Sequence, residues 1–189
     1  MREGIARLTL VLGAVMATGP LALDMYLPAL PTLEAEFAAS TARVQHTVSA
    51  YLFGMGLGQL AFGPLTDRFG RKRPLLAGLG IFTLASAGCA LAHSIDSFVL
   101  LRFAQALGGS AGMVVIRAVI RDRFDAIQSA RVLSLMMLVM GVAPILAPLA
   151  GGWLLVSGSW HWIFLVLAAY ALLCVAAVFL FLDESHPPE

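Results

Sequence analysis

The chain has 189 residues, of which 60% are hydrophobic and only 12% are charged. Soluble domains average about half apolar and about a quarter charged residues, so this composition, with a mean hydropathy of +0.89, excludes an ordinary soluble protein. The formal net charge of +1 gives no reason to expect a nucleic-acid partner, and we expect an integral membrane protein.

Long apolar runs follow one another along the chain, separated by short polar breaks. A helix that crosses the hydrocarbon core needs about 20 apolar residues. Six runs meet this requirement, at residues 8–30, 44–64, 75–92, 97–120, 132–156 and 160–182. The first run is longer than a typical signal core and lacks a convincing small-x-small cleavage site, so it is predicted to be a retained helix. The sequence therefore predicts one all-α domain over residues 1–189, a bundle of six transmembrane helices.

The first run carries an acid, Asp24, within LALDMYLPALP. At a rise of about 1.5 Å per residue, Asp24 lies roughly 5 Å to the outer side of the midplane. A carboxylate there costs at least about 2.5 kcal/mol, and such residues usually face a cavity, pair with a base or relay protons. Asp24 is therefore a candidate for proton coupling. The alternative is a structural Asp that stabilises irregular backbone before Pro28.

Small residues recur at four-residue spacing in the second and fourth runs. This spacing places them on one face of each helix, where small side chains let backbones approach closely. The residues are Ala50, Gly54 and Gly58 in the second run and Ala104, Gly108 and Gly112 in the fourth. We expect these stripes to be packing seams.

Residues 63–75, GPLTDRFGRKRPL, form a polar block between the second and third runs. Glycines at 63 and 70 allow a tight turn, an acid can cap a helix N-terminus, and bases can pair with acids or anionic lipid. The predicted gating and charge network comprises Gly63, Asp67, Arg68, Gly70, Arg71 and, at the end of the fourth run, Asp122. A solvated basic loop is the alternative, which explains the bases alone.

Arg102 is a charged residue within the fourth run, in LRFAQALG. It lies roughly 10 Å outward of the midpoint of that run. An arginine there would bias the proton affinity of nearby acids, so we expect Arg102 to share a cavity with Asp24 and to act in coupling. Gln105 is its neutral polar companion. The alternative is that Arg102 extends to the outer interface.

The fifth run contains GVAPILAPLAGG at residues 141–152. Pro144 and Pro148 remove helix hydrogen bonds, and Gly141, Gly151 and Gly152 permit close packing, so a kinked helix that resists leak is expected. The alternative is a packed helix without bearing on transport. In the sixth run, the amphipathic rings of Trp160 and Trp162 are expected to anchor the outer interface.

The basic residues gather at one side of the predicted bundle. The opposite loops hold Arg43 against Glu34, Glu36 and Asp96. The side that carries the N-terminus holds Arg2, Arg7, Arg68, Arg71, Lys72, Arg73, Arg121, Arg123 and Arg131. By the positive-inside tendency, both termini are expected in the cytoplasm.

No pattern of residues indicates an enzyme. There is no Walker-type loop, no clustered set of metal ligands and no Ser/His/Asp arrangement, so we expect no cofactor, no metal and no catalytic residue. Cys89 and Cys174 are interpreted as small buried hydrophobic residues. His46, His93, His161 and His186 lie near helix ends or in tails and receive no proton role.

Residues 63–75 resemble, at every defined position of G-x-L-x-D-R-x-G-R-K-x-x-L, the loop between helices 2 and 3 of the major facilitator superfamily. The segment around Arg102 resembles the superfamily's helix 4 arginine motif. Residues 141–152 resemble the helix 5 motif of drug/proton antiporters, with Ala147 where a glycine often precedes the proline. YLPALP after Asp24 and WHWIF at residue 160 look most like the bicyclomycin and chloramphenicol resistance branch.

The resemblance implies the N-terminal six-helix half of a twelve-helix fold. It implies proton-coupled export of small apolar drugs across the cell inner membrane, hence antibiotic resistance. Because the chain resembles one half alone, we expect a half-sized transporter that acts as a homodimer. The substrate-binding residues would be Met25, Tyr26, Tyr51, Phe53, Gln105 and Met113. The alternatives are an uptake carrier or facilitator of another solute, and a non-transporting half that needs a separate C-terminal partner.

Overall fold

The computed structural model describes residues 2–185, with side chains from residue 6 onward. Every regular element in this range is a helix, and η1 is a short 3-10 helix. The elements are α1 (Arg2–Asp24), η1 (Leu27–Ala29), α2 (Leu30–Glu36), α3 (Thr41–Phe69), α4 (Lys72–Ala90), α5 (Ile95–Arg123), α6 (Ala126–Ser157) and α7 (Trp160–Phe181).

Six helical stretches of the described chain are long and apolar enough to cross a membrane. The first combines α1, η1 and α2 over Ala6–Glu36, and each of α3 to α7 forms one more. The predicted six-helix membrane bundle is therefore confirmed. The second stretch reaches further than the predicted 44–64, because α3 continues through Pro64 to Phe69 and leaves only two residues before α4.

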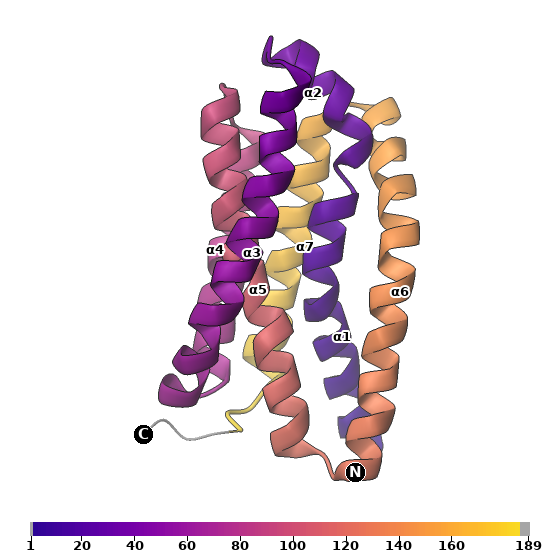
Figure 1. Ribbon diagram of the computed structural model, residues 1–189. Coiled ribbons are helices and arrows are strands. Elements are labelled where there is room, and N and C mark those ends of the chain that lie inside the picture. Colours follow the sequence, from indigo (N-terminus) through magenta and orange to yellow (C-terminus); the bar gives the residue numbers. More distant parts are fainter. Residues whose placement is uncertain (1, 186–189) are drawn as a thin grey trace.

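Each membrane-length helix of the bundle packs against at least two other elements. α5 packs against α1, α3 and α4, while α1 packs also against α6 and α7, and α4 packs against α7. Figure 1 shows these helices running roughly side by side, with the start of α1 and the end of α7 at the same end of the bundle. That arrangement follows from an even number of membrane crossings.

Glycines set the closest helix approaches. A Cβ added at Gly54 of α3 would lie 2.5 Å from the carbonyl oxygen of Phe103 in α5. A Cβ added at Gly108 of α5 would lie 2.5 Å from the carbonyl oxygen of Gly78 in α4. Real side chains do not fit at such distances, so the predicted packing seams at these positions are confirmed.

An aromatic cluster closes the end of the bundle opposite the start of α1. Trp160 is 1% exposed and packs edge-on against Phe98 with ring centroids 5.7 Å apart, whereas Trp162 is 54% exposed. The predicted interface position is therefore wrong for Trp160. Its ring instead fills the space between α5 and α7, where Phe37 and Phe164 also pack against it.

Candidate functional site

A fully buried arginine forms the centre of the candidate site. Arg102 lies in the first third of α5 and has an exposed fraction of 0%. Its Nη1 donates to the carbonyl oxygen of Ala22 in α1 at 2.9 Å and to Oε1 of Gln105 at 2.5 Å. The side chain therefore does not extend to the outer interface; it joins α5 to α1.

Three aromatic rings surround the Arg102 guanidinium. Its Cζ lies 4.1 Å from the ring centroid of Tyr26, 4.3 Å from that of Tyr51 and 5.6 Å from that of Phe164. A cation within about 6 Å of a ring face is attracted by the ring quadrupole, more strongly where water is excluded. These rings, from α3, α7 and the turn after α1, stabilise a positive charge that would be unfavourable in contact with lipid hydrocarbon.

Buried hydrogen bonds fix this shell of residues. The Tyr51 hydroxyl donates to the carbonyl oxygen of Gly19 at 3.0 Å, and the Tyr26 hydroxyl lies 3.1 Å from Oγ1 of Thr47. Nε2 of Gln105 donates to Oγ of Ser86 at 2.7 Å. The polar groups of the shell are thus paired with α1, α3 and α4, which holds the rings in place around the arginine.

Two nitrogens of Arg102 have no hydrogen-bond partner among the described residues. Nε and Nη2 are both buried and unpaired. A buried polar group without a partner costs about 1–3 kcal/mol, and more when it is charged. Retaining such a group in an otherwise well-paired shell favours a role in function over a role in stability.

Asp24 lies where the first membrane crossing is interrupted. It is the last residue of α1, and a turn at Met25 and Tyr26 separates it from η1. The side chain is half-buried and makes no hydrogen bond or ion pair within the described part of the chain, so it does not bond the irregular backbone before Pro28. Tyr51 lies within electrostatic reach of both Asp24 and Arg102. Both charged residues therefore act electrostatically on one tyrosine without forming an ion pair with each other.

One glycine of the Pro-Gly segment of α6 approaches this interruption very closely. A Cβ added at Gly151 would overlap the carbonyl oxygen of Met25, whereas one added at Gly141 or Gly152 would meet nothing within 4 Å. Pro144 is exposed and Pro148 is half-buried. Among the three predicted glycines of this helix, Gly151 therefore approaches the break after α1, whereas Gly141 and Gly152 face open space.

The predicted substrate-binding residues also divide into two groups. Phe53 is 64% exposed, and Met113 is half-buried, with its Sδ accepting from Nε2 of Gln59 at 3.7 Å. The other four, Met25, Tyr26, Tyr51 and Gln105, are buried within the bundle. Tyr26, Tyr51 and Gln105 belong to the shell around Arg102 instead of an open wall, because their polar groups pair with neighbouring helices. Met25 instead packs its backbone against Gly151 of α6.

A second charged centre joins α3, α4 and α5 at the end of the bundle where α1 begins. Nη1 of Arg71 donates to Oδ1 of Asp67 at 2.7 Å, and Nε donates to Oδ2 of Asp122 at 2.9 Å. Burial lowers the pKa of Arg71, but the hydrogen bonds and charges of the two carboxylates outweigh it and raise the pKa overall. The structure thus brings together the three residues expected to form a network.

The turn beside this network differs from the expected one. Gly70 has φ of 81°, a conformation that favours glycine, and with Arg71 it makes the whole connection. Gly63 lies within α3 instead, and Arg68 points its guanidinium over the ring of Phe69. The turn is shorter than expected because α3 remains helical through residues 63–69.

The carboxylate that caps α4 is Glu184, not Asp67 as the sequence suggested. Oε1 of Glu184 accepts from the backbone N–H of Arg71 at 2.7 Å, and Oε2 accepts from that of Lys72 at 3.1 Å. Nη2 of Arg123 holds the same segment by donating to the carbonyl oxygen of Asp183 at 2.7 Å. Sequence reasoning missed Glu184 because nothing local relates it to a helix more than a hundred residues earlier.

We expect Glu184→Ala to lower the stability of the folded chain by about 1 kcal/mol, within the range known for a lost N-cap. Thermal unfolding in detergent measures the change. Asp183→Ala is the matched control, because Asp183 contributes its backbone carbonyl to this contact. Equal melting temperatures for the two variants would contradict the capping role of the Glu184 side chain.

Arg117 is a further charge that sequence reasoning missed. It lies inside the predicted span 97–120, is exposed, and lines a pocket of about 240 Å³ with Asp67, Arg71 and Arg121. The available signal was the charge itself within an apolar run. Among the described residues, no group of three His, Cys, Asp or Glu side chains is arranged to hold a metal ion.

The fold and these charged centres agree with the comparison to known families. The model of the Major Facilitator Superfamily matches residues 11–189. The chain belongs to the major facilitator superfamily. The solved superfamily structures that resemble it include a proton:xylose symporter, with a TM-score of 0.87 at 18% identity, over 97% of this chain and 46% of the other. At that identity the likeness concerns the fold alone.

Curated superfamily proteins are more similar in sequence. An uncharacterised MFS-type transporter of Bacillus subtilis is 40% identical over 96% of this chain and 46% of its own length. A bicyclomycin resistance protein homologue of Haemophilus influenzae is 37% identical over 95% of this chain and 45% of its own. A multidrug resistance protein of Shewanella oneidensis is 38% identical over 88% of this chain and 42% of its own length. The chain therefore spans about half the length of the curated relatives it matches.

Proposed function

We propose that this chain is a six-helix unit of a proton-coupled exporter of small apolar drugs in the cell inner membrane. The observation that carries the proposal is the buried Arg102, with two unpaired nitrogens, beside the broken helix that carries Asp24. The names of relatives at 37% and 38% identity, a bicyclomycin resistance protein homologue and a multidrug resistance protein, support drugs as the substrate class.

In the proposed mechanism, Asp24 binds the proton, and the contacts of Arg102 change in response to the altered charge of Asp24. A protonated Asp24 is neutral and leaves the charge of Arg102 as the dominant one near Tyr51. Loss of the proton restores a negative charge that acts on the same tyrosine. Because the two unpaired nitrogens of Arg102 have no fixed acceptor, small movements of α1 can change what they contact. Proton binding would thus be coupled to movement at the break after α1.

A homodimer is the proposed working assembly. In twelve-helix relatives, the two six-helix halves share one orientation about an axis along the membrane normal. The described bundle begins and ends at the same side, so two copies can take the two positions without inverting either one. The basic residues at that side support a cytoplasmic location for both termini.

Transport by the purified chain tests the proposal. In proteoliposomes with an acidic interior, the chain should accumulate labelled bicyclomycin until an uncoupler is added, and its mass in detergent should equal two copies. Accumulation only with the opposite gradient would identify an uptake carrier. A single-copy mass with no transport would identify a unit that needs a separate C-terminal half.

A further inference from the structure

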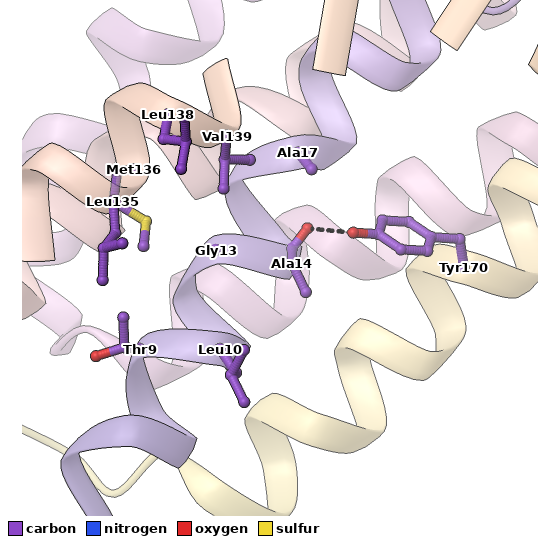
Figure 2. Close-up of a pocket in the computed structure, with 10 residues that line it drawn as sticks. All are labelled: Thr9, Leu10, Gly13, Ala14, Ala17, Leu135, Met136, Leu138, Val139 and Tyr170. Carbon is purple, nitrogen blue, oxygen red and sulfur yellow. Dashed lines mark hydrogen bonds between the residues drawn. The ribbon is translucent and has the colours of Figure 1, made fainter. Parts of the chain in front are cut away.

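An apolar groove runs between α1, α6 and α7 in the part of the bundle where α1 begins. Figure 2 shows Gly13 and Ala17 on α1, Leu135 and Val139 on α6 and Tyr170 on α7 along its sides. The groove has a volume of about 440 Å³, within the range of about 300–1,000 Å³ that is typical of ligand sites. Leu10, on its rim, is 74% exposed.

The sides of the groove offer a ligand little hydrogen bonding. The Tyr170 hydroxyl, the polar group on the α7 side, already donates to the carbonyl oxygen of Ala14 at 2.8 Å, as Figure 2 shows. Gly13 leaves space between α1 and α6, since an added Cβ would be 3.5 Å from Cε of Met136. The groove therefore suits an apolar occupant.

The depth of the groove matches one leaflet of a bilayer. Residues 9–17 of α1 span about 12 Å at a rise of 1.5 Å per residue, and half of the hydrocarbon core is about 15 Å. Both helices that form its long sides, α1 and α6, begin at this end of the bundle. The groove therefore extends from the headgroup level toward the midplane.

Two arginines stand at the headgroup end, one on each side. Arg7 precedes Leu10 by three residues and Ala14 by seven, and its guanidinium lies 5.3 Å from the ring centroid of Phe181 in α7. Arg131 precedes Leu135 by four residues and Leu138 by seven, so it lies on the groove side of α6. Neither arginine forms an ion pair within residues 6–185. Both charges are available to an anion.

We propose that this groove binds one acyl chain of an anionic phospholipid, whose phosphate is held by Arg7 and Arg131. Basic pockets between transmembrane helices on the cytoplasmic side suit anionic headgroups, and the apolar sides suit the chain. The site is distinct from the Arg102 shell and does not depend on transport. The assignment to the cytoplasmic leaflet rests on the proposed orientation, whereas binding in a symmetric bilayer does not.

Photolabelling in nanodiscs tests the site. The full chain is placed in a mixture of phosphatidylglycerol and phosphatidylcholine that contains a trace of either lipid with a diazirine at the end of one acyl chain. Phosphatidylglycerol should label residues 9–17 and 135–139 at least fivefold more than phosphatidylcholine does. The exposed residues Leu172 and Leu173 of α7 should show no preference between the lipids.

Charge variants and a groove-filling variant decide between a site and general lipid contact. The double variant Arg7→Gln/Arg131→Gln should reduce labelling by phosphatidylglycerol about 30-fold, from the usual contribution of each surface base. Arg73→Gln/Arg121→Gln removes equal charge from the same end of the bundle and should change it less than twofold.

Gly13→Leu should block labelling of residues 135–139, whereas Gly56→Leu, at a glycine with open space around it, should not. If Gly13→Leu does not fold, the charge variants still decide. Equal labelling by the two lipids, equal losses in both double variants, or crosslinks to a second copy at the groove would overturn the proposal.

Discussion

Asp24→Asn should abolish proton-driven export of bicyclomycin while leaving the fold intact. Asparagine has nearly the same shape but cannot bind and release a proton near neutral pH. Asp24 makes no hydrogen bond or ion pair within the described chain, so the substitution removes no structural contact. Transport in proteoliposomes with an acidic interior measures the loss, and thermal unfolding in detergent measures the unchanged stability.

Glu36→Gln is the matched control for this prediction. It also replaces a carboxylate by an amide, at an exposed position at the end of α2, and should retain export. The proton-coupling role of Asp24 would be wrong if Asp24→Asn still accumulated substrate with a normal response to pH. A large loss of stability in Asp24→Asn would instead indicate that the carboxylate supports the break after α1.

The six helices were predictable because a bilayer imposes a length on each apolar run. The position of the turn after α3 was predictable, but its length was not. Local sequence marks Gly70 as a turn residue, yet it equally marks Gly63, which the structure keeps inside α3. Neighbouring helices can re-satisfy backbone groups that Pro64 leaves unpaired, and sequence near the turn carries no information about those neighbours.

Which apolar side chains face the core and which face lipid was the main unpredictable feature. In a soluble helix, polar residues mark the exposed face, but here both faces are apolar. Phe53 and Tyr51 are two residues apart, yet one is 64% exposed and the other stacks on Arg102. Tyr26 and Gln105 looked suited to a ligand for the same reason that they suit a buried arginine: each combines an apolar body with a polar group.

Contacts between distant segments were equally hidden. Glu184 caps α4 and Ala22 accepts a hydrogen bond from Arg102, and each pair is separated by at least 80 residues. The charged residues of the network around Arg71 could be named in advance because an acid and bases in so apolar a chain need partners. Their pairing geometry needed the packing of α3 against α5.

The largest contrast between stability and function is expected at Arg102. Arg102→Met should keep or raise the thermal stability of the chain and abolish export. Methionine fills much of the same volume and removes a buried charge, whose effective desolvation penalty is on the order of several kcal/mol. The two unpaired nitrogens lose their desolvation cost, whereas the hydrogen bonds of Nη1 to Ala22 and Gln105 are given up.

Two further substitutions separate charge from volume at this position. Arg102→Ala removes both and should lower stability by about 2–5 kcal/mol, as truncations of large core side chains do. Arg102→Lys keeps the charge and should retain partial export, because one nitrogen of the arginine makes both of its hydrogen bonds and an ammonium has three donors. Export by Arg102→Met at the level of the unsubstituted chain would contradict the coupling role. Failure of Arg102→Met to fold would instead show that the three rings around this position require a cation, which would make the arginine a structural residue of the bundle.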